Sequence, residues 1–203
     1  MSQNISQLRP ELSLISEWIV PDSRVLDLGC GDGDLLVHLR DTRQVKGYGL
    51  EIDDNNIVTC VSRQLNVIQA DLDAGLNGFE ADSFDFVVMT QALQAMHYPD
   101  KVIEEMLRVG REAIVTFPNF GHWRCRLDLF LGRMPVTSSL PNTWYNTPNI
   151  HLCTLKDFEV FCQDKSIEII QRTVVDHTHK SSLMMSLLPN LMGEVAIYRI
   201  RRK

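Results

Sequence analysis

Apolar residues along the chain follow two alternating patterns, one typical of buried strands and the other typical of amphipathic helices. Between the strand-like runs, and also in residues 5–19, apolar residues recur every three or four positions. Strands that alternate with helices in this way predict an α/β fold, in which helices cover both faces of a mostly parallel sheet. The runs that predict the first five strands are residues 23–28, 47–52, 66–70, 84–89 and 112–117.

The last third of the chain predicts the remaining elements of the sheet. Thr154 and Asp157 have the spacing of a capping box, with a shorter acid than usual, where an amphipathic helix begins. Two further strands are predicted at residues 167–175 and 194–200, with a connection between them that lacks a helical pattern. We therefore expect these two strands to pair antiparallel at one edge of a seven-stranded, Rossmann-like sheet.

Two long segments interrupt the regular alternation. Residues 119–152 contain HWRCRLDLFLG, a predicted helix, and then a loop rich in Pro, Asn and Thr, whereas residues 176–193 are rich in Met and Leu. Both exceed the usual connections of roughly four to six residues, so we expect insertions in one domain over residues 1–203. On the predicted helix, one set of apolar side chains is expected to form a packed face: Trp123, Leu127, Phe130 and Leu131.

Composition and charge narrow the class of protein. The formal net charge of −6 argues against a protein that mainly binds nucleic acid. We find no apolar run near the roughly 20 residues of a membrane span, and the first residues do not resemble a signal peptide. The five cysteines are scattered, without a CxxC pair, which predicts neither zinc nor disulfides but reduced thiols in a cytoplasmic protein. No residue cluster indicates a metal site.

The most informative motif is VLDLGCGDGDLL, residues 25–36, which places three glycines directly after the first predicted strand. Open α/β sheets bind ligands beyond the carboxyl ends of their strands. The spacing departs from the dinucleotide pattern GxGxxG, because Asp34 stands where that pattern has glycine. A pyrophosphate there would also approach Asp27 and Asp32, and a like-charge contact at about 4 Å costs roughly 4 kcal/mol near a protein surface. A cationic nucleoside without phosphates, S-adenosylmethionine, avoids this penalty.

Residues at the ends of the next two strands fit the same ligand. Glu51 is placed to accept the ribose hydroxyls, Ile52 to pack on adenine, Asp71 to accept the adenine amino group, and Leu72 to offer its N–H. Taken alone, Glu51 or Asp71 could equally be a helix cap or a turn residue. The complete predicted set for S-adenosylmethionine or S-adenosylhomocysteine is Asp27, Gly29, Cys30, Gly31, Gly33, Glu51, Ile52, Asp71, Leu72 and Gln91.

These motifs carry a resemblance to a known superfamily. VLDLGCGDG, YGLEID and QADL resemble the first motif, the acidic loop and the adenine loop of class I S-adenosylmethionine-dependent methyltransferases, over about residues 20–118. The resemblance implies their fold and their cofactor.

The sequence gives no clear catalytic base. In MTQALQAMHYPD, Gln94 can orient polar groups but cannot act as a base, whereas His97 could, although a loop-capping histidine is the alternative. His122, after the fifth strand, is expected to face the same cleft, and Tyr145 lies in the long polar loop. We therefore keep His97, His122 and Tyr145 as the candidates for catalysis.

A narrower resemblance covers nearly the whole chain. The stretch GRMPVTSSLPNTWYNTPNIHLCTLKDFE, together with VVMTQALQAM and TFPNFGHWRCRL, is similar to the methionine biosynthesis protein MetW family. That resemblance implies a bacterial cytoplasmic protein that works beside homoserine O-acyltransferase, and it leaves open a homodimer. Two hypotheses follow from it. The chain binds S-adenosylmethionine and assists or regulates the acyltransferase, or it is an active methyltransferase for an unidentified small molecule.

Overall fold

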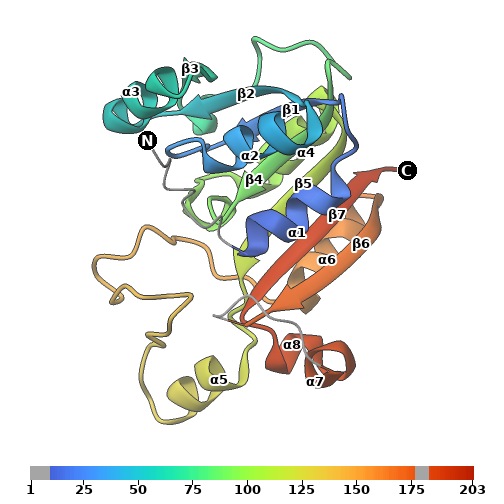
Figure 1. Ribbon diagram of the computed structural model, residues 1–203. Coiled ribbons are helices and arrows are strands. Elements are labelled where there is room, and N and C mark those ends of the chain that lie inside the picture. Colours follow the sequence, from blue (N-terminus) through green and yellow to red (C-terminus); the bar gives the residue numbers. More distant parts are fainter. Residues whose placement is uncertain (1–9, 177–182) are drawn as a thin grey trace.

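The computed structural model describes residues 10–176 and 183–203, which form a seven-stranded sheet between layers of helices (Figure 1). The strand order is β3-β2-β1-β4-β5-β7-β6, in which β7 runs antiparallel to both of its neighbours and the other pairs are parallel. This confirms the predicted α/β fold. The strands are β1 (Arg24–Leu28), β2 (Lys46–Glu51), β3 (Asn66–Gln69), β4 (Phe84–Thr90), β5 (Gly110–Pro118), β6 (Ile167–Val175) and β7 (Val195–Arg202).

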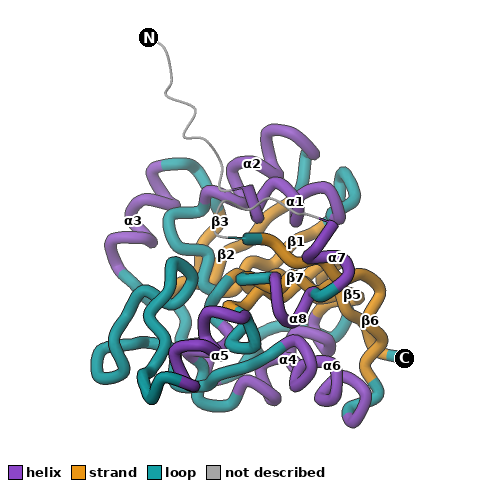
Figure 2. Tube along the Cα trace, turned by 90° about the horizontal axis from the view of Figure 1, so that it is seen from below, coloured by secondary structure: helices purple, strands orange, loops and turns teal. Residues whose placement is uncertain are grey.

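Helices cover both faces of the sheet, as predicted. Seen along the sheet, α1 and α2 lie on one side of the strands, and α4 and α6 lie on the other (Figure 2). The helices are α1 (Pro10–Trp18), α2 (Asp34–Arg43), α3 (Asp54–Ser62), α4 (Pro99–Val109), α5 (Trp123–Phe130), α6 (Leu155–Asp164), α7 (Leu183–Leu187) and α8 (Pro189–Met192), with 3-10 turns η1 (Leu72–Ala74) and η2 (Leu93–Ala95).

The two-sided core follows from the alternation of side chains along each strand. On β4, Val87 packs in the cluster that includes α4 and α6, whereas its neighbour Val88 packs in the cluster that includes α1 and α2. Ala113 and Ile114 divide between the same two clusters on β5. Because successive residues point to opposite faces, a strand buried on both sides needs the continuous apolar runs that the sequence contains.

Local capping explains where two of the helices begin. Thr154 Oγ1 accepts a hydrogen bond from the Asp157 amide, and the Asp157 carboxylate accepts from the Thr154 amide, so the predicted capping box is confirmed at α6. Asp53 caps α3 by accepting from the amides of Asn55 and Asn56. For the predicted first helix, α1 begins at Pro10, and the earlier positions lie outside the described residues.

Two expectations were wrong. The connection between β6 and β7 was expected to lack helices, but it contains the short helices α7 and α8. Pro189 begins α8 and separates it from α7, so neither helix is long enough to show a helical pattern in the sequence. The α5 side chains expected to pack are exposed, and Cys125 is its buried residue. Apolar spacing predicts an amphipathic helix, but it does not predict which other element of the fold packs against the apolar side of that helix. Figure 1 shows α5 beyond the end of β5, away from the sheet layers.

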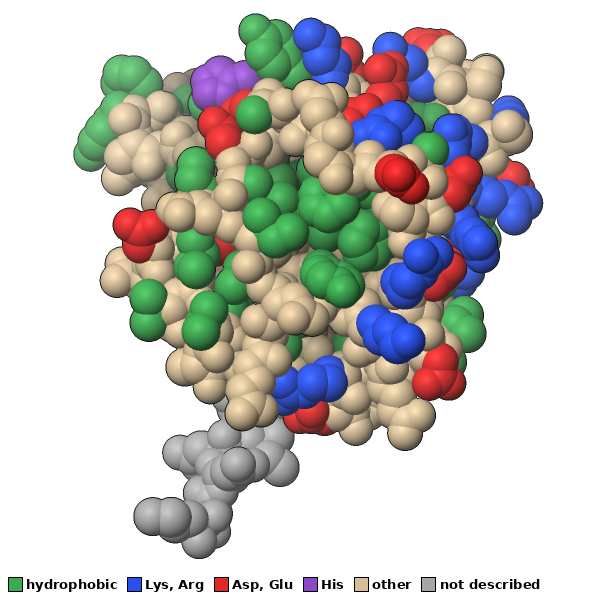
Figure 3. Space-filling model, turned by 90° about the horizontal axis from the view of Figure 1, so that it is seen from above, with side chains coloured by type: hydrophobic (Ala, Val, Ile, Leu, Met, Phe, Trp, Pro, Cys, Tyr) green, Lys and Arg blue, Asp and Glu red, His purple; other side chains and the backbone are tan. Residues whose placement is uncertain are grey.

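The end of the molecule that lies opposite α5 carries charges of both signs around a central apolar area (Figure 3). The start of β1, the start of β4 and the end of β7 supply some of these charges. Arg24 lies 3.8 Å from Asp85, and Arg202 lies 3.1 Å from Asp82. In the same basic tail, RIRRK, Arg199 contacts Glu112 of β5 and Arg201 lies 2.8 Å from Glu168 of β6. No helix in the described ranges is both long and apolar enough to cross a membrane.

Candidate functional site

The glycine loop joins β1 to α2 and bends back over β2. The amides of Gly29 and Cys30 both donate to the carbonyl of Leu50, at 2.8 and 3.1 Å. Gly31 has a φ of +56° and Gly33 one of +83°, so both occupy the left-handed region that favours glycine. A Cβ at Gly33 would lie 2.2 Å from a methyl carbon of Leu65, whereas one at Gly31 would meet no atom within 4 Å. Gly31 is thus the loop position that faces open space.

Glu51 fixes the glycine loop to the acidic loop. Its Oε2 accepts from the Gly31 amide at 2.8 Å, and its Oε1 accepts from the amides of Ile52 and Asp53 at 2.8 and 2.9 Å. Of about four lone-pair positions on an ionised carboxylate, three are therefore used, and the free one is on Oε2. Glu51 does not cap α3, because Asp53 does. The carboxylate instead lies nearly buried between two strand ends, beside the open face of Gly31.

The charges around the loop differ from those that the sequence implies. Arg63, which the sequence analysis did not identify, lies 2.7 Å from Asp34 and 3.5 Å from Asp32, and it also donates to the Asp32 carbonyl. Arg63 therefore offsets one of the three negative charges that Asp27, Asp32 and Asp34 would place near a pyrophosphate. Asp27 is buried under the loop. The choice of ligand therefore depends more on the Glu51 carboxylate than on loop charge.

Cys30 contributes its backbone rather than its thiol to the loop. Its Sγ lies 3.9 Å from Cys60 Sγ, in a small buried cluster with Leu36. Burial, followed by the Asp27 carboxylate, raises the pKa of the Cys30 thiol. The side chain is therefore a neutral packing group beneath the glycines.

The predicted adenine loop lies next to the acidic loop. The amide of Ala70 donates to the Glu51 carbonyl at 3.1 Å, which brings the end of β3 beside that of β2. Asp71 caps η1 by accepting from the Asp73 amide at 2.9 Å, so the turn-residue alternative describes its role in this structure. Ile52 is exposed at the same edge, as expected for a residue that would pack on a ring.

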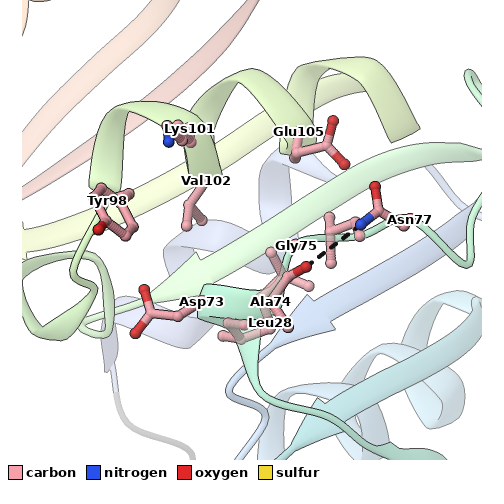
Figure 4. A pocket seen from close by; sticks show the side chains of 11 residues that line it. Leu28, Asp73, Ala74, Gly75, Asn77, Tyr98, Lys101, Val102 and Glu105 are labelled. Atoms are coloured by element: carbon pink, nitrogen blue, oxygen red, sulfur yellow. Dashed lines mark hydrogen bonds between the residues drawn. The ribbon is translucent and has the colours of Figure 1, made fainter.

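A cavity of about 240 Å³ opens between η1 and the first turns of α4 (Figure 4). Leu28 and Leu72 contribute apolar lining, Val102 points toward them from α4, and Lys101 and Glu105 add charges. Of the predicted cofactor residues, Leu72 is the one that lines it. The cavity therefore lies beside the adenine loop rather than at the glycine loop.

The loop after β4 is held by several parts of the chain. The amide of Gln91 donates to Thr116 Oγ1 at 2.9 Å, and its Nε2 donates to the carboxylate of Glu11 at 3.3 Å. Gln91 has a φ of +53°, an uncommon conformation that these bonds support. Glu11, nearly fully buried on α1, was missed by sequence reasoning because no motif links that helix to the site.

His97 joins the loop after β4 to the adenine loop. Its Nδ1 lies 2.6 Å from Asp73 Oδ2, and its amide donates to Asp73 Oδ1 at 2.9 Å. The hydrogen bond to Asp73 raises the pKa of the exposed imidazole. The Asp73 carboxylate thus occupies Nδ1 and the backbone amide of His97 together, and so ties the two loops to each other. The arrangement matches the loop-capping alternative.

The other two candidates for catalysis lie in different surroundings. His122 is buried, with Nε2 4.0 Å from Glu194 Oε1, and burial lowers its pKa. Ser139 Oγ donates to the other oxygen of Glu194 at 3.2 Å. Tyr145 is exposed on the long loop, edge-on to Trp144. The imidazole of His122 is thus buried beside Glu194, and its expected position in the cleft stays a prediction.

Within the part of the chain that the structure describes, no group of three His, Cys, Asp or Glu side chains could hold a metal ion. The histidines of HTH, residues 177–179, lie outside the described residues.

This fold and this loop arrangement define the class of protein. Many solved structures with the same fold are S-adenosylmethionine-dependent methyltransferases. One is phosphoethanolamine N-methyltransferase 2 of Haemonchus contortus in complex with phosphomonomethylethanolamine and S-adenosylhomocysteine, with a TM-score of 0.69 and 13% identity over 94% of this chain and 52% of that one. The chain thus has the class I methyltransferase fold.

Residues 9–200 match the family model of methionine biosynthesis protein MetW, and the chain belongs to that family. The bifunctional methionine biosynthesis protein MetXA/MetW of Rhodopirellula baltica is 34% identical over 200 residues, which cover 93% of this chain and 32% of that protein. The ubiquinone/menaquinone biosynthesis C-methyltransferase UbiE of Vibrio vulnificus is 30% identical over 129 residues, 58% of this chain and 50% of that one. The chain therefore spans half or less of these relatives.

Proposed function

We propose that this protein binds S-adenosylmethionine where β1 and β2 end, and that it assists or regulates homoserine O-acyltransferase. The observation that carries the ligand assignment is the Glu51 carboxylate, which three backbone amides hold beside the open face of Gly31. A fixed carboxylate at the end of the second strand suits a ribose. The MetXA/MetW relative, in which both names belong to one polypeptide, supports the partner.

The chain's own groups suggest how the ligand would be held. Glu51 has one free lone-pair position on Oε2, so it can accept one ribose hydroxyl without rearrangement. A second hydroxyl would have to replace one of the three amide bonds. Gly31 permits close approach of the loop backbone, and Ile52 offers an apolar surface at the adenine side. S-adenosylmethionine, when bound, would supply a sulfonium methyl group.

The surroundings of the candidate bases favour a protein that binds S-adenosylmethionine as a signal over one that consumes it in methyl transfer. His97 is paired with Asp73, His122 is buried against Glu194, and Tyr145 projects from the long loop. These three groups therefore lie in three different environments. The assisting role needs only that S-adenosylmethionine bind the free and the partnered protein with different affinities.

Active methyl transfer is the second candidate function, and the similarity to UbiE favours it. In-line methyl transfer needs mainly alignment of the two reactants, so it does not require a base. Incubation of the pure protein with labelled S-adenosylmethionine and a cell extract distinguishes the two functions. Formation of S-adenosylhomocysteine that requires intact Glu51 would establish the enzyme.

The main proposal is tested by calorimetry and an acyl-transfer assay. We expect S-adenosylmethionine to bind the wild type, and Glu51→Gln to weaken binding at least about tenfold, because the amide replaces a hydrogen-bond acceptor with a donor. Asp54→Asn removes a neighbouring exposed negative charge without touching the Gly31 amide, so it is the matched control. The acyltransferase should change its activity when the chain is added. Absence of ligand binding, or of any complex, would contradict the corresponding half of the proposal.

A further inference from the structure

We infer that α5 and residues 131–152, together called the insertion surface, form the face on which the acyltransferase docks. This inference rests on the proposed function and identifies the surface that the partner would contact. Half of all exposed large apolar side chains in the described ranges lie between residues 123 and 152. Such a concentration on one segment marks an interaction site, whereas isolated apolar side chains on a surface do not.

The composition of the insertion surface is that of a protein interface. Residues 134–154 contain no Asp, Glu, Lys or Arg. Their most prominent side chains are Trp144 and Tyr145, which are 74% and 72% exposed. Interface cores are enriched in Trp, Tyr, Met and Arg and are depleted of Lys, Glu and Asp. Arg124 and Arg133 precede this uncharged stretch, so the matching part of the partner should be apolar with an acidic margin on one side.

The insertion surface is also shaped to receive side chains of another protein. A groove of about 550 Å³ runs between α5 and the following loop, with Trp123, Leu127, Val136 and Pro141 in its lining. Grooves of this kind accept apolar anchors from a partner. Figure 2 shows this part of the chain standing beside the sheet layers rather than over them.

The loop is fixed at its base, so its aromatic side chains are presented by ordered backbone. The amides of Ile150 and His151 donate to the Gln94 carbonyl at 2.9 and 3.0 Å, and the amide of Phe120 donates to the Cys153 carbonyl at 3.0 Å. Leu140 is buried near the middle of the loop. Preorganised side chains lose less entropy on binding than flexible ones, which favours a specific protein partner.

The acyltransferase is the occupant that the observations favour. The Rhodopirellula relative joins MetXA and MetW in one polypeptide, which keeps the two parts together at high local concentration. A lipid surface is disfavoured because the insertion surface carries three basic residues, Arg124, Arg126 and Arg133, together with Asp128, whereas anionic lipids attract clusters of roughly four to eight. A second copy of this chain is the competing occupant, and the experiment distinguishes it.

The test compares the wild type with the aromatic variant Phe130→Ala/Trp144→Ala, which truncates the two most exposed aromatic side chains of the insertion surface. Calorimetry with purified acyltransferase should show at least about tenfold weaker binding for this variant. Val58→Ala/Val160→Ala is the matched control, since it truncates two exposed apolar side chains on α3 and α6, and it should bind like the wild type. S-adenosylmethionine affinity, far-UV circular dichroism and melting temperature should stay unchanged in both variants, which shows that each is folded.

Each outcome has a distinct meaning. Equal acyltransferase binding by the wild type and the aromatic variant would overturn the inference while leaving the proposed function intact. If the wild type itself fails to bind the acyltransferase, the proposed function fails first. A wild-type dimer in sedimentation experiments that the aromatic variant loses, without any loss of acyltransferase binding, would assign the surface to a second copy and overturn the inference.

Discussion

At the scale of single residues, Gly31 combines a left-handed backbone with open space, whereas Gly33 has the same backbone but no room. The motif alone predicts that glycines are needed but not which of them faces a ligand. Arg63 and Glu11 could not be predicted, because each reaches the site through tertiary contacts rather than through sequence spacing. The structure was also needed to distinguish Glu51 from Asp53. Glu51 joins the glycine loop to the acidic loop, whereas Asp53 caps α3.

Gly31→Ala should abolish or strongly weaken binding of S-adenosylmethionine, because its methyl group would occupy the open face of the loop. Its backbone strain should cost roughly 1–2 kcal/mol of stability. Gly132→Ala is the matched control, since Gly132 also has a left-handed φ of +74° and no neighbour within 4 Å of its Cβ position. Calorimetry and urea unfolding measure the two effects. Similar ligand affinity in both variants would show that Gly31 does not face the ligand.

The pKa of His97 should lie above the ordinary value of 6.5, and the pKa of His122 should lie below it. The hydrogen bond to Asp73 raises the pKa of His97, and burial lowers that of His122. NMR of the imidazole protons measures both values, and Asp73→Asn should return His97 toward 6.5 while leaving His122 unchanged. If His97 kept its raised pKa in that variant, Asp73 would not be the cause.

The same ion pair gives a defined dependence of stability on pH. Because the folded pKa of His97 is raised, its contribution is complete below pH 6.5 and is lost as the pH rises through the folded value. Because the folded pKa of Asp73 is lowered, its contribution is present above pH 3.8 and is lost as the pH falls through the folded value. Wild type and Asp73→Asn should therefore differ most in urea unfolding between these two pH values.

At the scale of elements, periodicity predicted most strands and helices, because burial on two faces imposes continuous apolar runs. It failed on α5, whose apolar side has no covering element among the described residues, and on α7 and α8, which are too short for a repeating pattern. Periodicity also cannot predict the contacts that hold the long insertion in place. They depend on Gln94, whose backbone carbonyl accepts two amides from that loop.

Gln94→Ala should destabilise the protein by about 1–3 kcal/mol, because it removes a buried hydrogen bond. The Gln94 side chain donates to the Pro118 carbonyl at 3.1 Å and is almost fully buried. Gln69→Ala is the control, since Gln69 donates to Asp54 at 2.7 Å but is exposed, and its loss should change stability little. Urea unfolding compares the two. Equal stabilities would mean that Gln94 does not hold the end of β5.

At the scale of the whole molecule, the fold class and the family could both be predicted, whereas the partner surface could not. The motifs for the fold lie in order along the first half of the chain, where strand and helix alternate without interruption. The insertion surface depends on which apolar residues stay exposed after folding, and exposure is a property of the tertiary structure. Trp144 therefore acquired a predicted role only with the structure, and the role predicted for Tyr145 changed from catalysis to partner binding.

If the chain regulates the acyltransferase through its ligand, the two binding events must affect each other equally. The affinity of the free chain for S-adenosylmethionine and that of the complex should differ, and S-adenosylmethionine should change acyltransferase affinity by the same factor. Calorimetry in both orders measures this thermodynamic cycle. Equal affinities in the free and bound states would exclude ligand-dependent regulation but not assistance.

The interior position of β7 links folding of the sheet to the order of synthesis, because β7 follows every other strand of the sheet in the sequence. A ribosome makes β7 after every other strand, yet it lies between β5 and β6, and Glu194 just before it accepts the hydroxyl of Ser139. In a nascent chain that still lacks β7, β5 has no partner strand on that side, and Ser139 cannot donate its hydrogen bond to Glu194. The long loop can therefore make this contact only after translation has passed residue 194.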